Sequence, residues 1–286
     1  MSRFVARFCT AFLAVAWFCS QTSTATALDV GDPAPKLAGK FIQGEPVQQF
    51  AGDKIYIVEF WATWCGPCKA AIPHLNELHN KYKDRGIVVI GQNVWEHDLE
   101  LPEPFVKEMG EKMSYRVALD DLSEEEKGTM AKTWMTAAGR NGIPSSFVVG
   151  RDGKISFIGH PSELTEEMMD QLLAGTFDPA AAKAKQLAEL KEREKRGEVS
   201  RAIFAAIAKK EFETAESKIT ELEEMLPETQ RYQSGTYRVD LAMAKGDHTA
   251  AVATANELAA KYPQNAALLF MMSQRLRARR LPRRNC

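Results

Sequence analysis

Apolar residues in the first half of the chain fall into short runs that amphipathic stretches separate. Ile55–Phe60 and Ile87–Gly91 are two such runs, and both have the composition of buried β-strands. Between them, Cys68–Tyr82 carries its apolar residues at helical spacing. A strand, a long helix and a strand form a βαβ unit, whose strands are parallel and whose crossover is almost always right-handed. We therefore expect an α/β fold in which helices cover a sheet.

A second group of elements is predicted between Gln92 and Arg140. Pro104–Lys112 indicates a short helix, Tyr115–Leu119 a strand, and Ser123–Ala138 a longer helix. The longer helix is expected to start at Ser123, because a serine followed three residues later by a glutamate is the capping-box pattern. Trp95–His97 end the preceding strand, and we interpret these three residues as surface packing rather than substrate contacts.

A hairpin and a final helix complete the first predicted domain. Asp152-Gly153 lies between the apolar runs Phe147–Val149 and Ile155–Ile158, which is a strong hairpin signal. Pro144 belongs at the first residue of the first of these strands, since proline cannot donate to a sheet ladder. Ser162–Ala174 is amphipathic and predicts the last helix of the domain.

Strand signals vanish after Asp178-Pro179, which we interpret as a domain boundary. Ala180–Arg196 is rich in Ala, Glu, Lys and Arg and predicts a solvated helix. Beyond it, a pattern of small, large, large and proline residues occurs twice, thirty-six positions apart, at Ala215, Ile219, Leu222 and Pro227 and again at Ala251, Ala255, Leu258 and Pro263. This spacing resembles the second helix of a tetratricopeptide repeat, so residues 179–286 are expected to form an all-α, TPR-like domain.

The first 27 residues have the pattern of a secretory signal peptide. Arg3 and Arg7 form a basic start, Phe8–Cys19 is an apolar stretch of about twelve residues, and Ala25-Thr26-Ala27 offers a cleavage site. The stretch is short for a membrane span, and an uncleaved anchor is the alternative. We expect export to the periplasm or another extracytoplasmic space, with membrane association if the signal is retained. The expected domains are then residues 1–27, 28–178 and 179–286.

Composition changes this picture little, but the cysteines add to it. The chain of 286 residues is 45% hydrophobic and 26% charged, as in soluble globular proteins. Its formal net charge of −1 gives no indication of nucleic-acid binding. Loss of the signal would remove Cys9 and Cys19 and leave Cys65, Cys68 and Cys286. Three cysteines are too few for a framework of structural disulfides, so the closely spaced pair is expected to be a working redox couple.

The candidate chemistry lies in Trp64-Cys65-Gly66-Pro67-Cys68, between a predicted strand and a predicted helix. Partial positive charge at a helix N-terminus favours a thiolate and lowers the pKa of a thiol there, so Cys65 is the expected reactive group. Cys68 is close enough to bridge it and to release a mixed disulfide. We expect no metal and no other cofactor, because no second CxxC or close histidine pair accompanies the first. His74 and His79, five residues apart, are interpreted as surface residues.

The segment from Glu59 to Lys69, EFWATWCGPCK, resembles the active-site signature of the thioredoxin superfamily, and the surrounding chain is most similar to its exported TlpA/ResA-type (redoxin) branch. This resemblance implies a thioredoxin-like fold, a mixed sheet flanked by helices, with an extra strand and helix after Gln92. It also implies that Ile143-Pro144 is a cis peptide packed against the cysteines. The backbone of Ile143 would then pair with an extended substrate.

By the same resemblance, Glu59 occupies the position of the buried acid of thioredoxin. Apolar surroundings would raise its pKa and let it accept and return the proton of Cys68. The family usually has aspartate there, and a solvated strand carboxylate is the alternative. A second acid of ResA-type proteins is replaced by Ala71, which weakens any claim to cytochrome c maturation. Trp61 and Trp64 are expected to flank the site as apolar walls, and the residues expected to contact substrate are Trp64, Gly66, Pro67 and Ile143.

These observations predict an exported thiol-disulfide oxidoreductase that reduces protein disulfides, with Cys65 attacking and Cys68 resolving. The expected partners are disulfide-containing proteins, a redox partner that recycles the cysteines, and a protein bound by the helical domain, but no nucleic acid. One alternative is a thiol peroxidase of the peroxiredoxin-like branch, although the Pro-x-x-x-Thr-x-x-Cys pattern is absent. The other is a non-enzymatic binding module that uses the helical tail.

Overall fold

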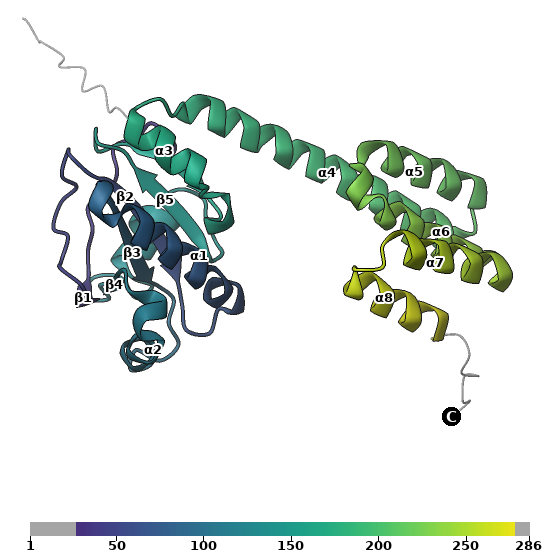
Figure 1. The fold of residues 1–286 in the computed structure, drawn as a ribbon, viewed down its shortest axis with the longest axis horizontal. Coiled ribbons are helices and arrows are strands. Elements are labelled where there is room, and N and C mark those ends of the chain that lie inside the picture. The colour runs from purple at the N-terminus through teal and green to yellow at the C-terminus, as the bar shows by residue number, and fades with distance from the viewer. Residues whose placement is uncertain (1–26, 278–286) are drawn as a thin grey trace, which may run out of the picture. The chain divides into compact units, whose positions relative to one another are not determined.

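The chain forms two compact units, which divide between Pro179 and Ala180. The computed structural model describes residues 27–277, so the expected signal peptide and Cys286 lie outside the described residues. The first unit is α/β and the second is entirely helical (Figure 1). An α/β domain followed by an all-α domain is the fold class expected from the sequence.

A six-stranded mixed sheet, in the order β1-β4-β3-β2-β5-β6, forms the centre of the first unit. β2, β3 and β4 are parallel to one another, whereas β1, β5 and β6 run antiparallel to their neighbours. The strands are β1 (Lys40–Gln43), β2 (Ile55–Trp61), β3 (Ile87–Asn93), β4 (Arg116–Leu119), β5 (Ser145–Val149) and β6 (Ile155–Gly159). The βαβ unit and the hairpin are as predicted, and the sheet is that of a thioredoxin-like fold.

Both faces of the sheet are covered, and all seven residues of β2 are buried. Ile57 and Trp61 belong to the core on the α1 side, and Val58 and Phe60 to the core on the opposite side, as the alternation of a strand requires. The helices of this unit are α1 (Gly66–Tyr82), α2 (Pro102–Met109), α3 (Glu166–Ala174), the π-helix η3 (Ala131–Thr136), and three short 3₁₀ segments, η1 (Lys83–Arg85), η2 (Gly110–Met113) and η4 (Pro161–Glu163). α1 and β2 together bring the two predicted cysteines to one end of the buried core.

The helix expected from Ser123 begins later, and that start was predicted wrongly. Gly128 has φ +95°, a left-handed conformation that interrupts a helix. The helical N–H groups of Met130 and Ala131 instead donate to the carboxylate of Asp120, at 2.7 and 2.9 Å. The cap therefore comes from the end of β4 rather than from Ser123.

The last helix of the first unit also begins later than the expected Ser162. The chain first forms the 3₁₀ segment η4, and α3 then starts at Glu166. The hydroxyl of Thr165 caps α3 by accepting the N–H of Met168 at 3.2 Å. The amphipathic pattern extended across both segments and concealed the break between them.

The second unit consists of α4 (Pro179–Lys209), α5 (Phe212–Met225), η5 (Glu228–Gln230), α6 (Tyr232–Lys245), α7 (His248–Lys261) and α8 (Ala266–Arg277). α4 continues past the expected end at Arg196, because Val199, Ile203 and Ala206 form a buried stripe at helical spacing that packs with α5. Over residues 27–277, none of the helices combines the length and hydropathy that a membrane span requires.

The repeated pattern of the second unit lies on buried faces of α5 and α7. Ala215 and Ala251 are fully buried, and the apolar residues that follow them in the pattern are buried as well. Gly235 on α6 lies against Leu258 on α7, and a Cβ at Gly235 would approach the Leu258 side chain to 2.5 Å. A side chain at position 235 would therefore force Leu258 to shift. Kinship with tetratricopeptide repeats stays a prediction.

Candidate active site

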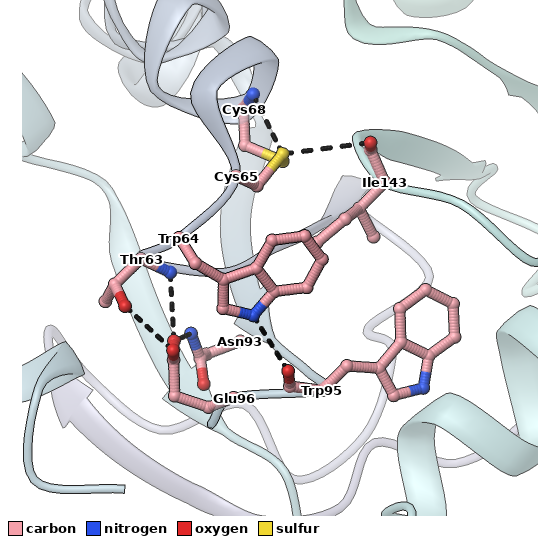
Figure 2. The surroundings of a disulfide bond; sticks show 8 residues. All are labelled: Thr63, Trp64, Cys65, Cys68, Asn93, Trp95, Glu96 and Ile143. Atoms are coloured by element: carbon pink, nitrogen blue, oxygen red, sulfur yellow. Dashed lines mark hydrogen bonds between the residues drawn. A yellow bond between two sulfur atoms is a disulfide. The ribbon is translucent and has the colours of Figure 1, made fainter. Parts of the chain in front are cut away.

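Cys65 and Cys68 form a disulfide at the N-terminus of α1, with 5.3 Å between their Cα atoms (Figure 2). Cys65 is the N-cap residue, and its Sγ accepts the backbone N–H of Cys68 at 3.1 Å. Pro67 lies in the first turn, where its missing N–H costs the helix nothing. The free N–H groups of the helix end are thus directed at the sulfur of Cys65, which is the arrangement that stabilises a thiolate.

The two cysteines differ in access to solvent. Cys65 is 4% exposed and Cys68 is 1% exposed. Gly66 and Pro67 between them are exposed, and a Cβ built on Gly66 would meet no atom within 4 Å. The surface beside the disulfide is therefore open to another molecule, and Cys65 is the sulfur nearer to it.

Ile143 and Pro144 lie beside the disulfide, at the start of β5. The peptide bond between them is cis. The carbonyl oxygen of Ile143 is 3.7 Å from the Sγ of Cys65. Both residues are half-buried, so the backbone of Ile143 forms an edge next to the reactive pair.

Trp64 is 47% exposed and is fixed in place by the loop that follows β3. Its indole N–H donates to the carbonyl of Trp95 at 2.9 Å, and its ring stacks on His97 with centroids 5.2 Å apart. Trp95 has φ +52°, which a non-glycine residue seldom adopts. Trp61 does not flank the surface of the site as expected, because it is only 1% exposed and packs on Phe105.

Glu96 holds the backbone just before the cysteines. Its two carboxylate oxygens accept the N–H of Thr63 at 2.9 Å and the Thr63 hydroxyl at 2.7 Å (Figure 2). Asn93 at the end of β3 donates to the same carboxylate at 2.9 Å. Trp95, Glu96 and His97 therefore hold the loop before the cysteines in addition to packing on the surface, and the interpretation that they make no substrate contact stays a prediction. Their place after a parallel strand, where α/β proteins gather site residues, was the signal that could have identified them.

Glu59 is 1% exposed in the interior of β2, and its Oε1 has no hydrogen-bond partner among the described residues. Burial raises the pKa of this carboxyl to about 8, because a charged carboxylate is poorly solvated there. The alternative of a solvated strand carboxylate is excluded. At pH 7 Glu59 is mainly protonated and holds a proton on the buried strand that leads to the cysteines.

The two histidines of α1 are not simple surface residues. His79 is 8% exposed, because it falls on the same helix face as Leu75, Leu78 and Tyr82. His74 is half-buried, and its Nε2 lies 2.9 Å from the carbonyl oxygen of Leu164. A carbonyl can only accept, so Nε2 carries the proton. Within residues 27–277 no cluster of three or more His, Cys, Asp or Glu residues is suited to a metal ion.

Two concave regions adjoin the active-site loops. A cavity of about 360 Å³ lies beside Pro67 and is lined by Ala71, the position of the missing acid, together with His74 and His160. A larger cleft of about 1030 Å³ is lined by Asn93, Trp95 and Glu96 together with residues between Leu119 and Asn141. Both lie next to residues that hold the disulfide or its loop.

Comparison with known proteins places the site in a wider group. A family model described as Redoxin matches residues 29–173, about half of the chain and nearly all of the first unit. The thiol-disulfide oxidoreductase ResA of Bacillus thuringiensis subsp. konkukian is 30% identical over 148 residues, which are 51% of this chain and 78% of that protein. Protein FixW of Rhizobium leguminosarum is 31% identical over 137 residues, 47% of this chain and 62% of that protein. A solved thiol:disulfide interchange protein of Chlorobium tepidum TLS is 26% identical, with a TM-score of 0.40, over 51% of this chain and 96% of that one.

Proposed function

Because the chain belongs to the redoxin family and is a thioredoxin-like thiol-disulfide oxidoreductase, we propose that it reduces disulfide bonds of other proteins outside the cytoplasm. The observation that carries the proposal is the place of Cys65: at the N-cap of α1, bonded to Cys68, and 3.7 Å from the carbonyl of Ile143. The sulfur of Cys65 thus lies at a helix N-terminus that favours a thiolate, next to Cys68, which can resolve a mixed disulfide, and next to the backbone of Ile143, which can pair with a substrate.

The first step is attack by the Cys65 thiolate on one sulfur of a substrate disulfide. A bond forms between that sulfur and Cys65 Sγ, the substrate S–S bond breaks, and the second substrate sulfur leaves as a thiolate. The helix N–H groups stabilise Cys65 as the thiolate before attack. The backbone of Ile143 pairs with the extended substrate chain, and the exposed Trp64, Gly66 and Pro67 contact its flanks.

The second step is release of the substrate by Cys68. In the fraction of molecules in which Glu59 is ionised, the thiol of Cys68 gives its proton to the Glu59 carboxylate, and the resulting thiolate attacks Cys65 Sγ. The bond between Cys65 Sγ and the substrate breaks, the Cys65–Cys68 disulfide forms, and the substrate sulfur that Cys65 had attacked leaves as a thiolate. Two electrons pass from the dithiol to the substrate, so a redox partner must return two electrons and two protons for the next cycle.

Reduction of insulin tests this function. The pre-reduced protein, residues 28–286, is expected to reduce the insulin disulfides and to be recycled by a small dithiol. Cys65→Ser is expected to abolish the reaction, because serine cannot form a mixed disulfide. Cys286→Ser is the matched control and is expected to retain full activity. Insulin reduction by Cys65→Ser at the rate of the unmodified chain would contradict the proposal.

Export is the second part of the proposal, and the pattern of residues 1–27 supports it. The mature chain is expected to begin at Leu28, after cleavage at Ala25-Thr26-Ala27. N-terminal sequencing of the protein recovered from a bacterial periplasm measures this directly. A full-length chain that stays in the cytoplasm would contradict export and leave the thiol chemistry to be judged by the insulin assay.

A further inference from the structure

Among the residues that the structure describes, five buried polar atoms in the layer between the sheet and α1 have no hydrogen-bond partner. They are Glu59 Oε1, Trp61 Nε1, His79 Nδ1, the Tyr115 hydroxyl and the hydroxyl of Ser146, which pairs with Glu59 across β2 and β5. Trp61 and Tyr115 belong to the core that includes α1, Glu59 shares a face of β2 with Trp61, and His79 is on α1 itself. Buried polar groups are nearly always partnered by protein or by ordered water. Five unpartnered atoms in one layer therefore indicate a function for these groups together.

Three of these groups, Glu59, Trp61 and Tyr115, converge at Gly91. Glu59 is the direct neighbour of Gly91 in the parallel ladder between β2 and β3. A Cβ built on Gly91 would lie 3.0 Å from Cε2 of Tyr115 and 3.2 Å from Nε1 of Trp61. The absence of a side chain at Gly91 thus lets the phenol and the indole reach the space beside the Glu59 carboxyl.

His79 extends this row of groups toward the edge of the core. Its ring meets the ring of Tyr115 edge to face, with centroids 6.3 Å apart. Its 8% exposure exceeds that of Glu59 and Tyr115, which are 1% and 0% exposed. The charged groups that face His79 are Lys83, Arg116 and Asp84. The row therefore runs from the fully buried carboxyl of Glu59 to the imidazole of His79, which lies near charged side chains.

All three titratable members of the row are uncharged at pH 7. Burial raises the pKa of Glu59 to about 8, and burial together with the negative charge of Glu59 raises that of Tyr115 well above its ordinary value. Burial, and then Lys83 and Arg116, lower the pKa of His79, while Asp84 opposes them. A neutral carboxyl, phenol and imidazole each donate one hydrogen bond and accept another. A chain of such groups can transfer a proton without holding a buried charge.

We propose that Glu59, Tyr115 and His79 form a proton relay, bridged by internal water, that connects the Cys68–Glu59 pair to solvent near the C-terminal end of α1. The relay rests on the proposed function, in which Glu59 takes the proton of Cys68. Protonated Glu59 gives its proton to a bridging water or to the Tyr115 oxygen, Tyr115 gives its own to His79, and His79 releases one to solvent. Every O–H or N–H bond that breaks is replaced by one that forms, and no electron moves.

A chromogenic aromatic disulfide tests the relay in a single turnover. Its leaving thiolates are coloured and stay unprotonated near pH 7, so the first equivalent of colour reports attack by Cys65 and the second reports resolution by Cys68. A pH indicator in the same stopped-flow cell reports the proton that leaves the protein. In the unmodified chain, proton release is expected to follow the second equivalent without delay.

Tyr115→Phe is expected to delay proton release about tenfold, because the phenol oxygen is the middle of the row. Tyr82→Phe is the matched control, since the hydroxyl of Tyr82 donates to the Glu166 carbonyl and is no member of the row, and no delay is expected there. His79→Ala is expected to show a similar delay that imidazole reverses. Pyrazole, which has the same shape but is far less basic, is expected not to reverse it.

The proton relay and the proposed function on which it rests would be contradicted by different results. Proton release in Tyr115→Phe and His79→Ala at the rate of the unmodified chain, with both coloured equivalents present, would overturn the relay alone. Equal rescue of His79→Ala by imidazole and pyrazole would also overturn it, by showing that the ring only fills space. Absence of the second coloured equivalent in the unmodified chain would overturn the proposed function itself.

Discussion

Glu59 is the residue at which the requirements of the fold and of the chemistry conflict most strongly. It lies in a fully buried strand, opposite Gly91 on one side and Ser146 on the other, and neither neighbour supplies a charge. A hydrophobic side chain would suit the position better. The carboxyl is tolerated because it keeps its proton up to about pH 8, and a pKa this close to neutral suits the proposed proton transfer from Cys68.

Replacement of Glu59 by glutamine is expected to change how stability depends on pH. The folded pKa, about 8, lies above the ordinary value of 4.5, so the folded protein binds this proton more tightly than the unfolded chain. Stability from Glu59 is complete below pH 4.5 and is lost as pH rises toward 8, by about 1.4 kcal/mol per pH unit. Glu59→Gln cannot titrate and removes this slope.

Urea unfolding of the disulfide form at pH 5, 6.5 and 8 measures the effect. The free energy of unfolding of Glu59→Gln minus that of the unmodified chain is expected to increase at each step. The exposed Glu100→Gln is the control and is expected to follow the unmodified chain. A constant difference between Glu59→Gln and the unmodified chain across this range would show that Glu59 is not protonated in the fold.

At the scale of elements, two loops at adjacent strand ends build the site. The loop after β2 carries Thr63, Trp64 and Cys65, and the loop after β3 carries Trp95 and Glu96. Four hydrogen bonds, from Thr63, Trp64 and Asn93 to Glu96 or Trp95, hold the two loops and the end of β3 together. Cys65 therefore takes its position from both strands as well as from the helix that it caps.

Glu96→Ala is expected to lower kcat/KM for insulin reduction about tenfold, because it removes three of these hydrogen bonds and frees the backbone before Cys65. The free energy of unfolding is expected to fall by about 1–3 kcal/mol. Glu100→Ala in the same loop is the control, since Glu100 is exposed and its side chain has no interaction of this kind with Thr63. Unchanged kcat/KM in Glu96→Ala would show that the link between the loops does not position Cys65.

The parts of the site that are continuous in sequence could be predicted. Of the long-range contacts, only the one that the family resemblance implied, between Ile143-Pro144 and Cys65, could be predicted. Strand, CxxC and helix follow one another from residue 55 to 82, and local pattern was sufficient there. Glu96 meets Thr63 across thirty-three residues, and His79 meets Tyr115 across the sheet–helix interface. The wrong helix start at Ser123 has the same origin, because the actual cap, Asp120, lies outside the helical pattern.

At the scale of the whole molecule, the unit that carries the cysteines and the helical unit have separate cores. Two apolar clusters fill the first unit and two others fill the second. The Redoxin match ends at residue 173, before the helical unit begins. The signature residues and every contact described around the disulfide belong to the first unit.

A chain of residues 28–179 is therefore expected to fold and to reduce insulin with kcat/KM within about twofold of residues 28–286. Circular dichroism and the insulin assay measure the two properties. A folded fragment that has lost most of its activity would show that the helical unit contributes to the reaction. The complementary helical fragment is expected to be inactive, because it contains neither Cys65 nor Cys68.

The central claim is that Cys65 attacks and Cys68 resolves, and trapping of the mixed disulfide tests it most directly. In Cys68→Ala, a substrate protein attacked by Cys65 cannot be released. After the reduced variant is mixed with insulin or another disulfide protein, one equivalent of covalent complex is therefore expected on non-reducing gels. A reductant should dissolve this complex, and mass spectrometry should place the bond at Cys65. The double variant Cys65→Ser, Cys68→Ala is expected to form none. A complex that forms equally in the double variant, or that is absent from Cys68→Ala while the unmodified chain reduces the same substrate, would contradict the account.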